Sequence, residues 1–272
     1  MSRVAVATRL GFREQARRPL LLVLLVALPF FFITRAIART EQLPRTVGLP
    51  GGGEVLTNMR DIHGADMAAI TVGFLAGLVG VFVMQSARQA DRRLVVAGFR
   101  PREALAPRLL VLAAATALVV AVSVAVTTLS FTAKLWPPFI GGILLVGLIY
   151  GMLGALAGAA VGQLGATYLI LFGAMLDLGV VQNPMFGSGA PPGWGAVLPG
   201  YGPGRVIVDA AFSDDFHAWG ALALSLAWTL VLALAVLFVL GRLVGMKDHR
   251  NATRTRLSPH RPPPRARDGS AT

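Results

Sequence analysis

The segment RQADRRLVVAGFRPREALAPR, residues 88–108, lies between two long apolar runs and decides how the chain is oriented in a membrane. It carries six arginines and only two acids, and short arginine-rich loops are retained on the cytoplasmic side of a membrane. Residues 91–97 contain no helix breaker, Gly98 suits a helix end, and Pro101 with Glu103 suits the first turn of a second helix. The segment therefore predicts a cytoplasmic loop made of a helix, a glycine bend and a second helix.

The composition predicts an integral membrane protein. Of 272 residues, 55% are hydrophobic and 14% are charged, and the mean hydropathy is +0.66. This is more apolar surface than one soluble core can bury, and the apolar residues are grouped in blocks. The formal charge of +12 comes mainly from arginines beside those blocks or in the C-terminal tail. It therefore indicates contact with anionic lipid headgroups rather than with nucleic acid. The absence of cysteine excludes disulfides and thiolate ligands.

Six apolar blocks predict an all-α fold with six transmembrane helices. Each block is long enough, or nearly so, to cross a hydrocarbon layer of roughly 30 Å. Six spans place both termini on one side, where nineteen arginines and lysines would face six on the other side. Both termini are therefore expected in the cytoplasm, and the arginine- and alanine-rich composition favours the cytoplasmic membrane of a bacterium. The blocks are residues 19–34, 67–84, 109–131, 139–161, 164–181 and 219–240.

The two ends of the chain differ from the apolar middle. Residues 1–18 place arginines on one helical face, which predicts an amphipathic helix in the headgroup layer. An unstructured basic leader and a signal peptide cleaved near Ala36–Ala38 are the alternatives. The transmembrane domain is predicted over residues 19–245, with the cytoplasmic loop at 85–108. The tail, residues 246–272, is basic and rich in proline, and is expected to be disordered.

Two polar segments are predicted on the outer side. Residues 35–66 have mixed charge and a glycine hinge at 51–53, which indicates a polar loop. Residues 182–218 form the longest outer connection and are rich in proline and glycine. Within this connection, residues 206–212 predict a short helix, so that the segment is expected to be partly re-entrant before the last span.

Glycines in the fourth apolar block recur every three or four residues and so share one helical face. Such a stripe lets another helix approach closely, which predicts a packing seam. The partner helix could belong to the same chain or to a second protomer, and the sequence leaves both open. The stripe consists of Gly147, Gly151, Gly154, Gly158 and Gly162.

Asp177 is the only acid inside any predicted apolar block, and Gln182 and Asn183 follow it. A carboxylate in lipid is costly, so Asp177 is expected to face the bundle interior or a wet cavity. It also lies about 20 Å along its helix from Leu164, near the outer mouth, where a polar residue is cheaper. A role in a substrate path and a structural or interfacial role both stay open for these three residues.

The sequence lacks the motifs of an enzyme. Its only lysines, Lys134 and Lys247, do not follow glycine, so the chain contains no phosphate-binding loop of the form G-x-x-x-x-G-K-[ST]. It contains no H-E-x-x-H motif, and His63 has no second histidine near it, so a solvated loop is expected there rather than a metal site. Residues 187–189, Gly-Ser-Gly, predict a turn rather than a serine nucleophile. No catalytic residue, metal or cofactor is expected in this chain.

The six-span topology, the basic leader, the loop DRRLVVAGFRPREALAPRLL and the later LPGYGPGR at 198–205 together resemble the permease subunits of type-2 ABC exporters. The resemblance covers residues 2 to about 245 and rests more on topology than on any one motif. The glutamate usual early in the loop of that family is missing, with Asp91 in its place, and the fifth span is short. The loop pattern is carried by Asp91, Arg92, Arg93, Leu94, Gly98, Arg100, Pro101, Arg102 and Glu103.

The resemblance implies a transport function that a partner energises. Residues 88–108 would form a coupling helix docked on a separate ATPase subunit, present in two copies, which would bind the ATP and Mg. Residues 2–18 would form the interfacial elbow helix, and two permease protomers would line the export path. Where the ATPase subunit docks, Arg88 and the other loop arginines would pair with its acids, while Leu94, Val95 and Phe99 would be apolar anchors.

Other functions stay open at the level of sequence. A secondary carrier or channel could use Asp177 as a relay, and its flux would be abolished by a protonophore. A membrane anchor or sensor would show no flux. Residues 88–108 could also only orient the chain in the membrane. The aliphatic spans permit hydrophobic or amphiphilic substrates but select none.

Overall fold

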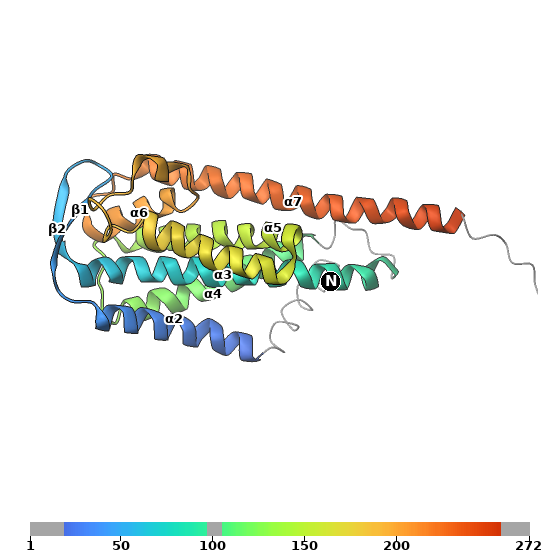
Figure 1. Cartoon of the computed structure of the whole chain (residues 1–272), viewed down its shortest axis with the longest axis horizontal. Coiled ribbons are helices and arrows are strands. Elements are labelled where there is room, and N and C mark those ends of the chain that lie inside the picture. Colours follow the sequence, from blue (N-terminus) through green and yellow to red (C-terminus); the bar gives the residue numbers. More distant parts are fainter. Residues whose placement is uncertain (1–18, 97–104, 257–272) are drawn as a thin grey trace, which may run out of the picture.

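The computed structural model describes residues 19–96 and 105–256 as a helical bundle with a two-stranded sheet at one end (Figure 1). We call this end the hairpin end, and the opposite end, where α3 and α7 finish, the arginine end. The predicted interfacial helix and the tail beyond residue 256 lie outside the described residues. The elements are α2 (Pro19–Arg39), β1 (Pro44–Gly48), β2 (Glu54–Asn58), α3 (Met59–Val96), α4 (Leu105–Thr127), α5 (Trp136–Leu176), the π-helix η2 (Asp177–Val181), the 3-10 helix η3 (Gly193–Val197), α6 (Tyr201–Phe212) and α7 (Trp219–Arg256).

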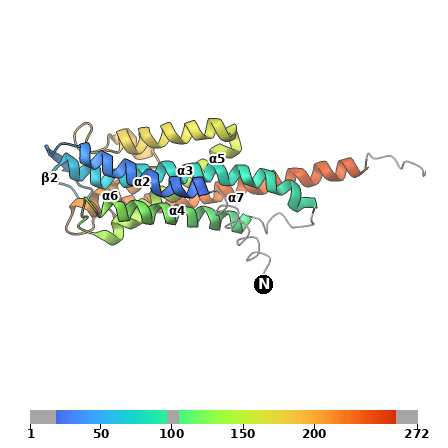
Figure 2. The ribbon, with the colours of Figure 1, turned by 90° about the horizontal axis from the view of Figure 1, so that it is seen from below.

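The long helices run side by side, and this arrangement is that of a multi-pass membrane protein (Figures 1 and 2). Within the described residues, four segments are long and apolar enough to cross a membrane. They contain or overlap the second to sixth predicted blocks, and α2 contains the first. The number of six spans and the side of the termini stay predictions. The four segments are Met59–Gln85, Leu109–Thr127, Trp136–Val181 and Trp219–Val239.

The third of these segments contains two of the predicted spans. At about 1.5 Å per residue its 46 residues would measure roughly 69 Å, twice what a membrane needs. Gly162 interrupts the helix with φ 79° and ψ −179°, and the chain folds back there. Ala157 and Ala166 consequently share one apolar cluster. α5 therefore has a first arm, residues 136–161, and a second arm, residues 163–176, which is the yellow helix at the top of Figure 2.

The predicted glycine stripe packs the first arm of α5 against α3. A Cβ added to Gly154 would collide with the carbonyl oxygen of Gly77, and a Cβ added to Gly80 would collide with that of Gly151. The two backbones thus touch at both points, which only residues without a side chain allow. Both helices of the seam, α3 and α5, belong to this chain. Of the two partners left open by the sequence, the helix of the same chain is therefore the one found.

The other three glycines of the stripe have different surroundings. Gly147 faces side chains of Thr116 and Val72, and Gly158 lies against the backbone of Val81. Gly162 has no atom within 4 Å of the place a Cβ would take, and its positive φ favours glycine. The expectation that Gly162 belongs to the seam is wrong, because this residue forms the turn between the two arms.

A β-hairpin occupies the middle of the polar loop predicted for residues 35–66, so the all-α prediction is incomplete. β1 and β2 pair antiparallel, with Pro44 opposite Asn58 and Gly48 opposite Glu54. The expected glycine hinge is the hairpin turn, where Gly52 and Gly53 take positive φ values. The remainder of the predicted loop is helical, in α2 and α3.

α3 begins eight residues earlier than the apolar block that predicted it. The side-chain oxygen of Asn58 accepts a hydrogen bond from the backbone N–H of Asp61 at 2.9 Å, and so caps the first turn. Asn58 also donates to the Asp61 carboxylate at 2.5 Å. As a consequence, Asp66 lies within the helix, where the sequence had placed it in a solvated loop.

The hairpin, residues 182–200 and α6 pack together as a cap over the hairpin end (Figure 1). The backbone N–H of Gly48 donates to the carbonyl of Gly189 at 3.1 Å. The Arg205 guanidinium donates to the carbonyl of Gly48 at 2.8 Å and joins α6 to the hairpin. α6 itself starts five residues before the short helix predicted for residues 206–212.

Candidate functional site

Asp177, the predicted path residue, is the centre of a buried polar network. It is the first residue of η2, and 6% of its surface is exposed. One carboxylate oxygen accepts the Tyr150 hydroxyl at 2.5 Å and the backbone N–H of Gly200 at 2.9 Å, and the other accepts the Gln182 amide at 3.0 Å. Three donors therefore hold both oxygens, as a buried carboxylate requires.

The same carboxylate fixes the start of α6. Gly200 directly precedes the first residue of this helix, and its N–H is one of the donors that an α-helix leaves unpaired at its N-terminus. A Cβ on Gly200 would lie 2.8 Å from the Asp177 carboxylate and 2.7 Å from the side chain of Leu178. Asp177 thus ties the two arms of α5 and the start of α6 together, which is the structural role left open by the sequence.

Gln182 and Asn183 lie in the same buried region. Gln182 donates its amide to Asp177 and also to the carbonyl of Gly195 at 3.1 Å, which holds the proline- and glycine-rich segment against η2. The Asn183 side-chain oxygen accepts the backbone N–H of Met185 at 2.8 Å and closes a turn. The Gln182 side-chain oxygen is buried and has no partner among the described residues.

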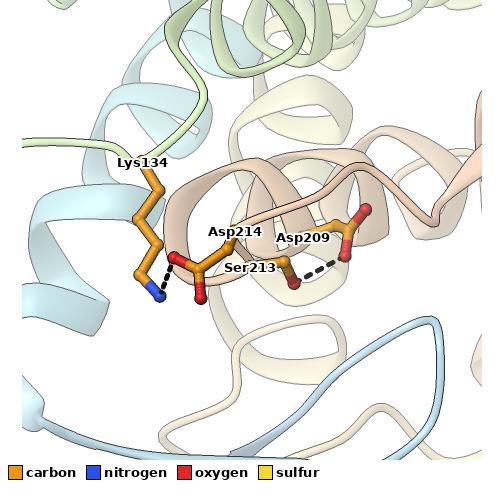
Figure 3. A network of polar contacts seen from close by, with 4 residues as sticks. All are labelled: Lys134, Asp209, Ser213 and Asp214. Atoms are coloured by element: carbon orange, nitrogen blue, oxygen red, sulfur yellow. Dashed lines mark hydrogen bonds and ion pairs between the residues drawn. The ribbon is translucent and has the colours of Figure 1, made fainter.

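Asp209 is a second organising carboxylate, which the sequence analysis did not identify. It is fully buried in α6 and accepts the backbone N–H groups of His217 at 2.6 Å and Ala218 at 2.9 Å. The Ser213 hydroxyl donates to its other oxygen at 2.8 Å (Figure 3). These residues immediately precede α7, so Asp209 stabilises the N-terminus of the last long helix. The run Asp209-x-x-x-Ser213 is the local signal that could have indicated a polar helix end.

Lys134 and Asp214 form an ion pair beside this cap, with 2.8 Å between ammonium and carboxylate (Figure 3). The Asp214 side chain is 88% exposed, so water screens the pair. The pair borders a pocket of about 390 Å³ that Glu54, Asp215 and His217 also line.

Within residues 19–96 and 105–256, no group of three His, Cys, Asp or Glu side chains could hold a metal ion.

His63 is part of α3 and not of a solvated loop. Its ring nitrogen is in hydrogen-bond contact with the Thr40 hydroxyl, just beyond the end of α2. The contact joins the first turns of α3 to the segment that follows α2. The solvated environment expected for His63 was wrong, because α3 starts before it.

Asp66 is an acid that the sequence analysis placed in a polar loop and that the structure places in α3. It lies in the candidate span Met59–Gln85, and 8% of its surface is exposed. Its Oδ2 is buried and has no hydrogen-bond partner among the described residues. The helix-capping pair Asn58 and Asp61 was the available signal, since it moves the start of the helix far enough to include Asp66.

The loop predicted to dock a partner is divided between two helices. α3 continues from its apolar part without interruption to Val96, and α4 begins at Leu105. The first helix predicted for the loop, residues 91–97, is helical as far as Val96, and it is an extension of α3. Arg88, Asp91, Arg92, Arg93, Leu94 and Val95 lie in this extension, whereas Gly98, Phe99, Arg100, Pro101, Arg102 and Glu103 lie outside the described residues.

No protein family, curated protein or solved structure matches this chain in sequence or fold. The function is therefore argued from the residues and their geometry.

Proposed function

We propose that this chain is the membrane-spanning permease subunit of a type-2 ABC exporter for a hydrophobic or amphiphilic substrate. In this proposal, two such subunits line the path, and separate ATPase subunits dock on residues 88–108. The observation that carries the proposal is the continuity of α3 from the hairpin end of the bundle into the arginine-rich segment.

The length of α3 suits a lever between a soluble partner and the bundle. Its 38 residues measure roughly 57 Å, while a membrane needs about 30 Å. The apolar part ends at Gln85, and the remaining eleven residues carry Arg88, Arg92 and Arg93. A force applied to these arginines would act on a rigid helix and not on a flexible loop.

The packing of α3 would pass such a force into the bundle. The seam against α5 brings backbone to backbone at Gly77 and Gly80, so the two helices cannot slide past each other without separating. The first arm of α5 is joined in turn to Asp177 through Tyr150, and Asp177 holds the start of α6. Movement of the arginine end would therefore reach the cap at the hairpin end.

The proposed source of energy is a partner subunit, because the sequence lacks a phosphate-binding loop and carries arginines that could dock such a subunit. Its 272 residues hold no Gly-Lys pair and hence no phosphate-binding loop, so nucleotide hydrolysis is assigned to a partner. A carrier that uses Asp177 as a relay is less favoured, because three donors already hold that carboxylate. Arginines on a helix extension instead suit the acidic rim of a soluble subunit.

The test is co-purification and ATPase activity with an ATPase subunit, for which a neighbouring reading frame that encodes the phosphate-binding loop would be the candidate. Asp91→Ala combined with Arg92→Ala should reduce co-purification and the stimulation of ATPase activity while leaving membrane insertion intact. Arg242→Ala is the matched control, because this arginine follows the apolar part of α7, as the substituted residues follow that of α3, and contacts Phe238. Normal co-purification and activity of the double variant would show that docking occurs elsewhere. Transport by the purified chain without a partner would contradict the proposal as a whole.

A further inference from the structure

Asp66 differs from the other buried carboxylates of the bundle. Asp177 and Asp209 each accept hydrogen bonds from three donors, at distances of 2.5 to 3.0 Å. Asp66 is nearly as buried as these two residues, yet in the described part of the chain no hydrogen bond or ion pair reaches it. The bundle therefore supplies donors to two carboxylates and none to the third.

An ionised carboxylate without donors is costly in an apolar span. Removing its charge by binding a proton costs far less than burying the charge unpaired. In membrane helices, such acids are the usual sites at which protons bind. The neutral form of Asp66 is the one that its surroundings favour, because no donor among the described residues is present to stabilise a charge.

Another buried polar atom without a partner among the described residues lies just after η2, an element that packs against α3. Ile70, one helical turn further along the same face of α3, is the nearest side chain to Gly179 of η2. Gln182 follows η2 directly, and its buried side-chain oxygen also lacks a partner. The contact between α3 and η2 thus lies one helical turn from Asp66, and the unused acceptor of Gln182 follows this contact along the chain.

We propose that Asp66 is a proton-binding site of the bundle, neutral at neutral pH, which releases its proton to water when the pH is raised. The step breaks the carboxyl O–H bond, transfers the proton to water and leaves the carboxylate. It needs no partner subunit, so it can be tested independently of the proposed ATPase docking.

Charged and titratable groups on the surrounding elements do not neutralise Asp66. In the described residues, hydrogen bonds to other groups engage Arg60, Tyr150, Arg205 and Asp209. Lys134 follows Phe131, which packs on Gly64 of α3, and is paired with Asp214. Residues 109–127 of α4 contain no charged or titratable side chain. The groups on the elements that pack against α3 are Arg35 and Arg39 of α2, Glu54 of β2, Tyr150 and Tyr168 of α5, Asp177 of η2, and Tyr201, Arg205 and Asp209 of α6; α3 itself adds Arg60, Asp61 and His63.

Infrared spectroscopy of the full chain in lipid tests the proposal. The spectrum of the wild type minus that of Asp66→Asn at neutral pH should contain the carbonyl band of one protonated carboxyl group. Asp214→Asn is the control, because its exposed carboxylate pairs with Lys134 and should give carboxylate bands instead. Carboxylate bands, or no protonated band, in the Asp66 difference spectrum would overturn the proposal.

A second measurement does not depend on the spectrum of the variant. In the wild type alone, the protonated band should disappear when the pH is raised, and the thermal midpoint should fall in the same pH range, because the buried group must then be charged. Asp66→Asn should not lose stability in that range, since its amide does not ionise. A wild type whose band and midpoint stay constant from neutral to alkaline pH would also refute the proposal.

Discussion

Gly154→Ala tests whether the contact between α3 and the first arm of α5 holds the bundle together. The added methyl group would collide with the carbonyl oxygen of Gly77, and would lie 2.8 Å from its carbonyl carbon and 3.0 Å from its Cα. These are backbone atoms, so no side-chain rotation can remove the collision and the helices have to separate. Overpacking of this kind costs about 1–3 kcal/mol.

The chain offers two matched controls for this substitution. Gly141 and Gly173 lie in the two arms of the same helix and have no atom within 4 Å of the place a Cβ would take. Alanine favours a helix over glycine by about 0.5–1 kcal/mol at all three positions, so the difference between Gly154→Ala and the controls isolates the collision. This difference should be about 1–3 kcal/mol in the free energy of unfolding.

The assay is unfolding of the purified chain in detergent micelles, followed by the loss of helical circular dichroism. Gly80→Ala should behave like Gly154→Ala, because it meets the carbonyl oxygen of Gly151 from the other side of the seam. If both variants are as stable as Gly141→Ala and Gly173→Ala, the backbone contact is not what holds α3 against α5.

Two further substitutions test the carboxylates that organise the cap. Asp209→Ala removes the acceptor of the donors before α7 and should lower the free energy of unfolding by about 1–3 kcal/mol, whereas Asp214→Ala, at an exposed side chain, should leave it unchanged. Equal effects of the two would show that Asp209 does not cap α7. Tyr150→Phe removes one of the three donors to Asp177 and should cost about 1.5–3 kcal/mol, while Tyr168→Phe, on the exposed side of the second arm, serves as the control without loss.

The apolar pattern predicted the helices well because each block corresponds to one helical segment. It also located the turn between the arms of α5, since the stretch is too long for one span and glycine can take a positive φ at residue 162. The glycine stripe predicted a close helix contact, but the identity of the partner helix depended on tertiary packing. A stripe in one helix carries no information about the helix that it faces.

The features that the sequence did not predict depend on short or non-local signals. The hairpin consists of five-residue strands with mixed polarity, and its glycines were interpreted only as a hinge. Asp66 was placed in a loop because the apolar block was started at Met67, although the cap at Asn58 begins the helix earlier. The partners of Asp177 and Asp209 come from segments that fold back over the bundle, so no local pattern could specify them.

Site-specific labelling of single cysteines in intact cells tests most directly whether the arginine end faces a cytoplasmic partner. The chain has no cysteine, so Gln89→Cys in the α3 extension and Leu56→Cys in the exposed strand β2 can each be followed alone. A membrane-impermeant maleimide should label Leu56→Cys from outside and should reach Gln89→Cys only after the cells are permeabilised. Labelling of Gln89→Cys in intact cells, with Leu56→Cys protected, would place the arginine end outside and contradict the account.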